Sequence, residues 1–190
     1  MMHTTNIKLI LFTALTSISN ISYAEKAPFE SSYEPLPSTN TIFRNANIYD
    51  GEGNEFYETD LLIKDGKIIA MGTDLPGSPE FIEVDASGKW ITPGIIDIHS
   101  HMGVYSAPSV SSSSDGNEST SPITADVWAE HSIWTQDPQF ALALKGGVTT
   151  FHVLPGSANL IGGRGVTAKN LQRNTINSMK FPNAPHTLKM

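Results

Sequence analysis

The sequence predicts an α/β fold in which several short strands come first and a strand–helix–strand unit follows. Segments of apolar and β-branched residues, separated by turn residues, fill residues 41–92. After them, residues 91–154 contain a buried strand, a capped helix and a second apolar strand, which is how a parallel α/β barrel begins. A third observation concerns chemistry, because the first strand of this unit ends in two histidines one residue apart.

The early strands are delimited by turn residues. Asp65-Gly66 is a two-residue hairpin signal whose glycine accepts a positive φ. A second turn cluster, Asp50–Gly53, closes the first apolar run. The candidate strand segments are residues 42–49, 61–64, 67–71, 81–85 and 89–92, and the turn residues separate them. We therefore expect three or four short antiparallel strands ahead of the strand that carries the histidines.

The second half of the chain has equally local signals. Asp137 and Pro138 predict the start of a short helix, because aspartate favours the N-cap and proline the first helical position. A glycine pair after residue 145 ends that helix. Residues 148–154 are apolar on both faces, as is typical of a parallel strand buried from both sides. The spacing of apolar residues also predicts a helical segment over residues 126–134.

The first strand of the barrel unit ends in His99 and His101. Side chains alternate along a strand, so both imidazoles point to one side with Cα atoms roughly 6.5 Å apart, and such a pair can share one metal ion. Ile96 and Ile98 are expected on the opposite face, packed against helices, whereas Asp97 lies on the histidine side and could orient the ligands. A chance pair is the competing interpretation, because the chain has 6 histidines.

The Pro-Gly step and the apolar run before these histidines resemble the opening of the amidohydrolase superfamily, whose first barrel strand reads PG[IL]IDxHxH. Other short strings resemble the imidazolonepropionase-related branch of secreted amidohydrolases. They are Asp115–Glu118, Gly147–Thr150, Leu154–Asn159 and Met179–Phe181. The resemblance covers nearly all of residues 41–190. It implies part of a small β-sandwich in residues 41–90 and the start of a metal-dependent (β/α)8 barrel, or TIM barrel, in residues 91–190.

The resemblance also implies a reaction. It is metal-dependent hydrolysis of carbon–nitrogen bonds, other than peptide bonds, in a small amide, a cyclic amide or an acyl amino acid. His99 and His101 are the expected metal ligands; zinc is the expected ion, with iron and manganese left open. The family's catalytic aspartate would fall beyond Met190. The alternatives are an Xaa-Pro dipeptidase-like peptidase, an inactive fragment, or a non-catalytic binding protein that keeps the fold.

The glycine-rich loop after the second barrel strand contains two candidate substrate contacts, Asn159 and Arg164. The arginine fork suits a carboxylate, although a tight loop with an exposed arginine explains the pattern equally well. A nucleotide-binding loop is excluded, because five residues rather than four separate Gly156 from Gly162 and no Lys-Ser/Thr pair follows. His152 is expected to be a hydrogen-bonded core histidine, with an approach to the metal as the alternative.

The first 24 residues have the features of a secretory signal peptide, with a short apolar stretch at residues 9–15 and small residues before a cleavage point after Ala24. The apolar stretch is shorter than the roughly 20 residues of a membrane span. We expect a periplasmic or secreted protein with an exposed leader in residues 25–40. A complete barrel needs about 250 residues, so the sequence is expected to be the N-terminal portion of a longer enzyme and inactive alone.

Charge and composition restrict the classes of partner that the protein is expected to bind. The net charge of −7 becomes −8 when residues 1–24 are removed, because that segment contains Lys8 and no acid. An acidic chain is a poor ligand for nucleic acid or anionic membranes. The absence of cysteine excludes a disulfide framework. The expected partner is a small-molecule substrate, with no membrane contact after signal cleavage, and an oligomer is left open.

Overall fold

The structure is a computed structural model that describes residues 30–190. The signal peptide predicted for residues 1–24 lies outside the described residues, as does the beginning of the leader. The strands are β1 (Thr41–Tyr49), β2 (Glu55–Lys64), β3 (Lys67–Gly72), β4 (Ile82–Asp85), β5 (Trp90–Ile91), β6 (Ile95–Ser100), β7 (Val148–Val153), β8 (Gly163–Arg164), β9 (Val166–Lys169) and β10 (Leu188–Lys189). The α-helix α1 is Pro138–Lys145, and short 3₁₀ turns occupy Ser111–Ser113, Ala129–His131 and Ile176–Ser178.

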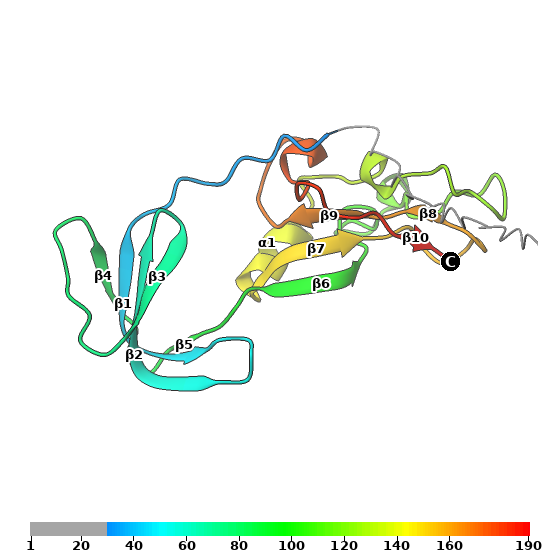
Figure 1. Ribbon diagram of the computed structural model, residues 1–190. Helices are drawn as coiled ribbons and strands as arrows, with labels where there is room; N and C mark the ends of the chain where they lie inside the picture. Colours follow the sequence, from blue (N-terminus) through cyan, green and yellow to red (C-terminus); the bar gives the residue numbers. More distant parts are fainter. Residues whose placement is uncertain (1–29) are drawn as a thin grey trace, which may run out of the picture.

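The strands form two groups joined by the short segment between β5 and β6 (Figure 1). One group is the sheet of β1 to β5, and the other contains β6, β7 and β9 beside the small β8–β10 pair. Within residues 30–190, no helix combines the length and the apolar character needed to cross a membrane. The leader segment from residue 30 to residue 40 runs from the second group to β1, and the backbone N–H of Ser32 donates to the carbonyl of Asn177 at 2.9 Å.

The first sheet has the strand order β3-β2-β1-β4, with β5 also paired to β1. The predicted hairpin is confirmed, because Asp65 and Gly66 both have positive φ angles, of 50° and 72°, between the antiparallel strands β2 and β3. β2 is longer than expected and begins at Glu55 rather than at Leu61. Buried side chains of β1 and β2 form the core of this sheet, which includes Ala46 and Ile48.

The prediction that all of these early strands are antiparallel is wrong, because β4 and β5 pair with β1 in parallel. The segment after β3 crosses the sheet to the other side of β1. β4 therefore begins beside the first residues of β1 and runs in the same direction. Thr41 is level with Ile82, and Asn47 is level with Trp90. A turn signal specifies that the chain reverses, but it does not specify which neighbour the next strand finds.

Arg44 links three strands of this sheet. Its Nη1 donates to Asp60 Oδ2 on β2 at 2.7 Å and to the Leu75 carbonyl at 2.6 Å, and its Nη2 donates to Glu83 Oε1 on β4 at 2.8 Å. Burial raises the pKa of Asp60, but hydrogen bonds from Arg44 and from two backbone N–H groups outweigh burial and leave this pKa below its usual range. The ion pairs therefore hold β4 beside β1.

The second sheet has the order β6-β7-β9. β6 and β7 are parallel and are connected through α1, so the predicted strand–helix–strand unit is confirmed. β9 returns antiparallel to β7, which departs from an all-parallel arrangement. The core beneath this sheet includes Phe140 of α1 and Phe151 of β7, whose rings stack with centroids 5.1 Å apart.

Of the two helices predicted from the sequence, the structure contains one. α1 begins and ends as predicted, with the Asp137 side chain accepting from the Gln139 N–H and the glycine pair closing the helix. The prediction of a helix over residues 126–134 is wrong, since the regular structure there is limited to a 3₁₀ turn at Ala129–His131. The carbonyl of Val127 accepts instead from the N–H of Arg164 on β8 at 2.7 Å. That carbonyl is therefore not used for a helical hydrogen bond.

The isoleucines of β6 are not packed against helices, contrary to prediction. Ile95, Ile96 and Ile98 are 53%, 62% and 76% exposed. β6 pairs with β7 on one side, and no strand among residues 30–190 pairs with its other edge. An apolar strand with an unpaired edge is a surface prone to association.

We expect this chain to self-associate through β6, and the change Ile98→Lys to shift it toward the monomer. A charge on the edge strand opposes pairing with a second edge. Sedimentation velocity at several concentrations measures the effect, and Leu36→Lys, at an exposed leucine of the leader, is the matched control. A wild-type chain that sediments as a monomer at every concentration would contradict the expectation.

Candidate metal centre at the end of β6

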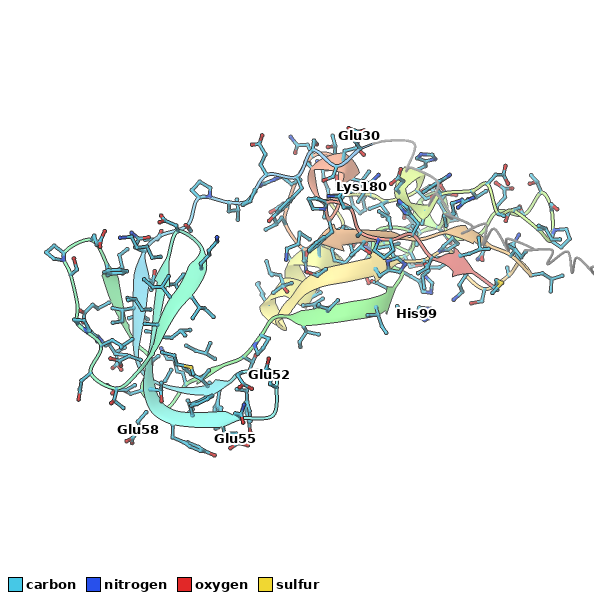
Figure 2. All side chains as sticks on the ribbon, viewed as in Figure 1. Glu30, Glu52, Glu55, Glu58, His99 and Lys180 are labelled. Carbon is cyan, nitrogen blue, oxygen red and sulfur yellow. The ribbon has the colours of Figure 1, made fainter. Side chains whose placement is uncertain are left out.

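The two histidines of the predicted pair lie together at the carboxyl end of β6. The ring centroids of His99 and His101 are 5.3 Å apart, and the rings are inclined at 80°. His99 is exposed at the end of the strand (Figure 2), whereas His101 is half-buried. The alternation of side chains along β6 therefore brings the imidazoles to one side, as the spacing predicts.

A backbone carbonyl orients His101. Its Nδ1 lies 2.9 Å from the carbonyl oxygen of Leu154, the residue after β7. A carbonyl oxygen only accepts, so the partner assigns the proton of the neutral ring to Nδ1 and leaves the lone pair on Nε2. The N–H of Leu154 in turn donates to the Ser100 carbonyl at 3.0 Å. Metal-binding histidines commonly have such a hydrogen bond on the nitrogen opposite the metal.

Two other residues contact His99. Asp97 accepts from the backbone N–H of His99 through Oδ1 at 3.1 Å, so its carboxylate orders the turn at the end of β6. Lys189 of β10 places Nζ 3.1 Å from His99 Nε2. The sequence analysis does not identify Lys189, because its place beside His99 depends on the pairing of two short strands, β8 and β10.

The two imidazoles are suitable donors for a divalent ion, but they are fewer than the protein ligands that such an ion usually has. Two neutral imidazoles on one side of a strand end are suitable ligands for zinc. Catalytic zinc usually has three protein ligands and a water. In the part of the chain that the structure describes, no group of three or more histidine, cysteine, aspartate or glutamate side chains is arranged to hold an ion. His99 and His101 would therefore supply only two of the ligands that such a site needs.

His152 on β7 is a hydrogen-bonded core histidine, as expected. It is 8% exposed. Its Nδ1 is 2.9 Å from Thr167 Oγ1, and its Nε2 is 2.6 Å from Thr187 Oγ1. Burial lowers the pKa of His152, and the nearby His186 and His99 lower it further. The ring is therefore neutral at a pH where an exposed histidine is partly charged.

This shift predicts a loss of stability in weak acid. The unfolded pKa of histidine is about 6.5 and the folded value is lower, so the contribution of His152 is complete above about pH 6.5 and is lost as the pH falls from there through the folded pKa. We expect the free energy of unfolding of the wild type to be lower at pH 5.5 than at pH 8. The variant His152→Gln should show a smaller decrease in this free energy. Urea unfolding at both pH values measures this. The change His131→Gln, at an exposed histidine, is the control, and equal losses in all three proteins would contradict the assignment.

The loop after His101 is fastened by Asp137, the N-cap of α1. Asp137 is 2% exposed and its carboxylate accepts from the backbone N–H groups of Gly103 at 3.0 Å and Ala107 at 3.2 Å. It also accepts from the backbone and side-chain nitrogens of Gln139 at 3.0 and 2.9 Å. The sequence predicts the cap alone. The same carboxylate also fixes the chain that follows the histidine pair.

Asn159 and Arg164 have partners within the loops that follow β6 and β7. Asn159 Nδ2 donates to the carbonyls of Glu118 at 2.5 Å and Ser121 at 2.8 Å. The guanidinium of Arg164 lies 5.0 Å from the centre of the Trp128 ring. Both residues therefore hold loops together at this end of the sheet.

A small cavity of about 50 Å³ lies between these loops, lined by residues 115–118, Val104, Ala129 and Pro155 among others. A water needs about 10–15 Å³ by this measure, whereas sites for drug-sized ligands have about 300–1,000 Å³. The cavity can hold a few waters or a small polar group, not a whole substrate.

Comparisons with known proteins relate the chain to hydrolases. It is 36% identical over 140 residues to the amidohydrolase tasK of Hapsidospora irregularis, which covers 72% of this chain and 14% of that protein. It is 38% identical over 63 residues to the dihydroorotase of Ligilactobacillus salivarius, which covers 32% of this chain and 14% of that protein. No family model matches the chain.

One solved structure shares the fold. The amidohydrolase from Thermotoga maritima aligns with a TM-score of 0.71 and 35% identity, over 79% of this chain and 38% of that chain. The present chain therefore spans well under half the length of these relatives. The mixed, mostly stranded architecture described above resembles the N-terminal domain of that structure. The homologues of this chain are amidohydrolases, and together they support its relationship to the amidohydrolase superfamily.

Proposed function

We propose that this chain functions in a metal-dependent hydrolase that cleaves carbon–nitrogen bonds, other than peptide bonds, in small amides, cyclic amides or acyl amino acids. The observation that carries the proposal is the pair His99 and His101 at the carboxyl end of β6, with His101 oriented by a backbone carbonyl. Parallel α/β folds place their chemistry at this end of the strands. The relatives named amidohydrolase and dihydroorotase support the class of reaction.

The residues of the chain have distinct roles in this proposal. His99 and His101 would hold the ion, with zinc preferred and iron or manganese also compatible. A bound ion supplies an acidified water and polarises the carbonyl of the substrate. The Leu154 carbonyl keeps the proton of His101 on Nδ1, and Asp97 orders the backbone of His99. Asp137 holds the chain after the pair in place.

The finer assignments extend this proposal. The strings in residues 115–118, 147–150, 154–159 and 179–181 support the imidazolonepropionase-related branch, and residues 1–24 support export to the periplasm or the exterior. β6, α1 and β7 would begin a (β/α)8 barrel, and β1 to β5 would form part of its small β-sandwich. Asn159 and Arg164 remain candidates for contact with a small-molecule substrate.

The test uses protein expressed from the complete gene. N-acyl amino acids, cyclic amides and Xaa-Pro dipeptides are assayed before and after chelation, and again with added zinc. We expect hydrolysis of an amide or acyl amino acid that chelation abolishes and zinc restores. Turnover that survives removal of all metal would overturn the proposal, and selective cleavage of the dipeptides would replace it with a peptidase.

A further inference from the structure

Tyr105 lies against the imidazole of His101. The N–H of Tyr105 donates to the carbonyl of His101 at 3.1 Å, so a single turn brings the tyrosine back to the histidine four residues earlier. The two rings meet edge to face, with centroids 5.6 Å apart and an angle of 79°. Aromatic pairs favour this arrangement. His101 therefore has a hydrogen bond to Leu154 through one ring nitrogen and an aromatic neighbour beside it.

The far end of the tyrosine is held as well. Asn117 Nδ2 donates to the Tyr105 hydroxyl at 2.5 Å, and Asn117 Oδ1 accepts from the N–H of Ala158 at 3.1 Å. The carbonyl of Tyr105 accepts from Gln139 Nε2 at 2.8 Å. The tyrosine is thereby connected to the loop after β7 and to α1. Its backbone, ring and hydroxyl each have a separate contact.

Two glycines make room for this ring. A Cβ at Gly116 would overlap the Tyr105 ring, and a Cβ at Gly156 would overlap the Tyr105 hydroxyl and the Asn117 side chain. The N–H of Gly156 donates to the Gly116 carbonyl at 2.6 Å, so the two glycines together form one wall of the space that holds the Tyr105 ring. The loops after β6 and β7 therefore enclose the hydroxyl end of the tyrosine closely.

We infer that Tyr105 is a positioning residue for His101. The Leu154 carbonyl sets which ring nitrogen carries the proton, and the Tyr105 ring limits rotation of the imidazole, so that Nε2 keeps one direction. The inference rests on the proposed function, because the direction of Nε2 matters only if that atom binds an ion. Neighbours that orient metal ligands commonly change metal affinity by about 10- to 100-fold when they are replaced.

The experiment compares four variants of the protein expressed from the complete gene. Tyr105→Leu removes the ring, and Tyr105→Phe removes only the hydrogen bond between the hydroxyl and Asn117. Asn117→Ala removes that bond together with the one that Asn117 Oδ1 accepts from Ala158. Tyr57→Leu is the matched control, because Tyr57 lies on β2 in the other sheet and is 60% exposed. Zinc alone is the titrant for affinity. Nitrogen-15 NMR of the histidine rings without metal, at pH 8, reports the proton position on His101.

We expect Tyr105→Leu to weaken zinc binding about 10-fold and to mix the two tautomers of His101. Tyr105→Phe should weaken binding by about threefold, since it loses one hydrogen bond and keeps the ring. Asn117→Ala should weaken binding at least as much, since it also loses the bond to the N–H of Ala158. The control should match the wild type in both measurements. A purely structural role would lower the unfolding midpoint of Tyr105→Leu without changing the His101 spectrum.

Unchanged zinc affinity and an unchanged His101 spectrum in folded Tyr105→Leu would overturn the inference. If that variant does not fold, Tyr105→Phe and Asn117→Ala decide. Weaker zinc binding in both variants supports the role, and wild-type behaviour in both refutes it. Wild-type protein from the complete gene that binds no zinc would instead refute the proposed metal site, while the metal-free NMR spectra would still show whether Tyr105 positions His101.

Discussion

Replacing both His99 and His101 by alanine is expected to reduce bound zinc to background and to abolish metal-dependent hydrolysis by the protein from the complete gene. Each imidazole is one ligand of the proposed site, and two of the usual three protein ligands of catalytic zinc are lost together. His99 is exposed and His101 half-buried, so the chain should remain folded. Elemental analysis of the purified protein measures bound zinc, an amide-hydrolysis assay measures turnover, and circular dichroism checks the fold.

The control is His131→Ala, which removes an exposed histidine from the 3₁₀ turn Ala129–His131. It should keep the zinc content and the activity of the wild type. Unchanged zinc in the double variant, with an intact fold, would refute the assignment of the two histidines as ligands.

Replacing Asp137 by alanine is expected to lower the free energy of unfolding by about 3 kcal/mol. Loss of an N-cap costs about 1 kcal/mol, and a buried donor left without a partner costs about 1–3 kcal/mol. The variant would leave the N–H groups of Gly103 and Ala107 without their acceptor. Zinc binding should weaken too, because the chain after His101 loses its anchor to α1.

Urea unfolding measures this loss. Asp126→Ala removes an exposed aspartate from a neighbouring segment and is the matched control, with an expected change within about 0.5 kcal/mol. Asp137→Asn should be intermediate, since an amide keeps one accepting oxygen. A loss below about 1 kcal/mol in Asp137→Ala would show that water replaces the carboxylate.

Several features could be predicted from the sequence because they depend on a few adjacent residues. The Asp65-Gly66 hairpin needs only two residues that accept positive φ. The start of α1 needs only an accepting side chain and a proline with a fixed φ. The histidine pair needs only the alternation of a strand.

Other features were missed because they depend on residues far apart in the chain. Glu130 and Lys180 form a buried ion pair with Oε2 and Nζ 2.6 Å apart, although 50 positions separate them. Neither residue stands in a pattern that indicates a partner. Lys189 lies beside His99 although 90 positions separate them, through the pairing of β8 and β10. The parallel pairing of β4 with β1 belongs to the same group.

The sequence by itself determined the hairpin at Asp65-Gly66, the start and end of α1, and which side of β6 carries His99 and His101. Those properties follow from backbone torsion and from side-chain period, which act over a few residues. Only the tertiary structure decided the direction of β4, the 3₁₀ turn at Ala129–His131 and the surroundings of the imidazoles. These depend on which distant groups meet, because each buried donor or acceptor takes the partner that packing brings within reach.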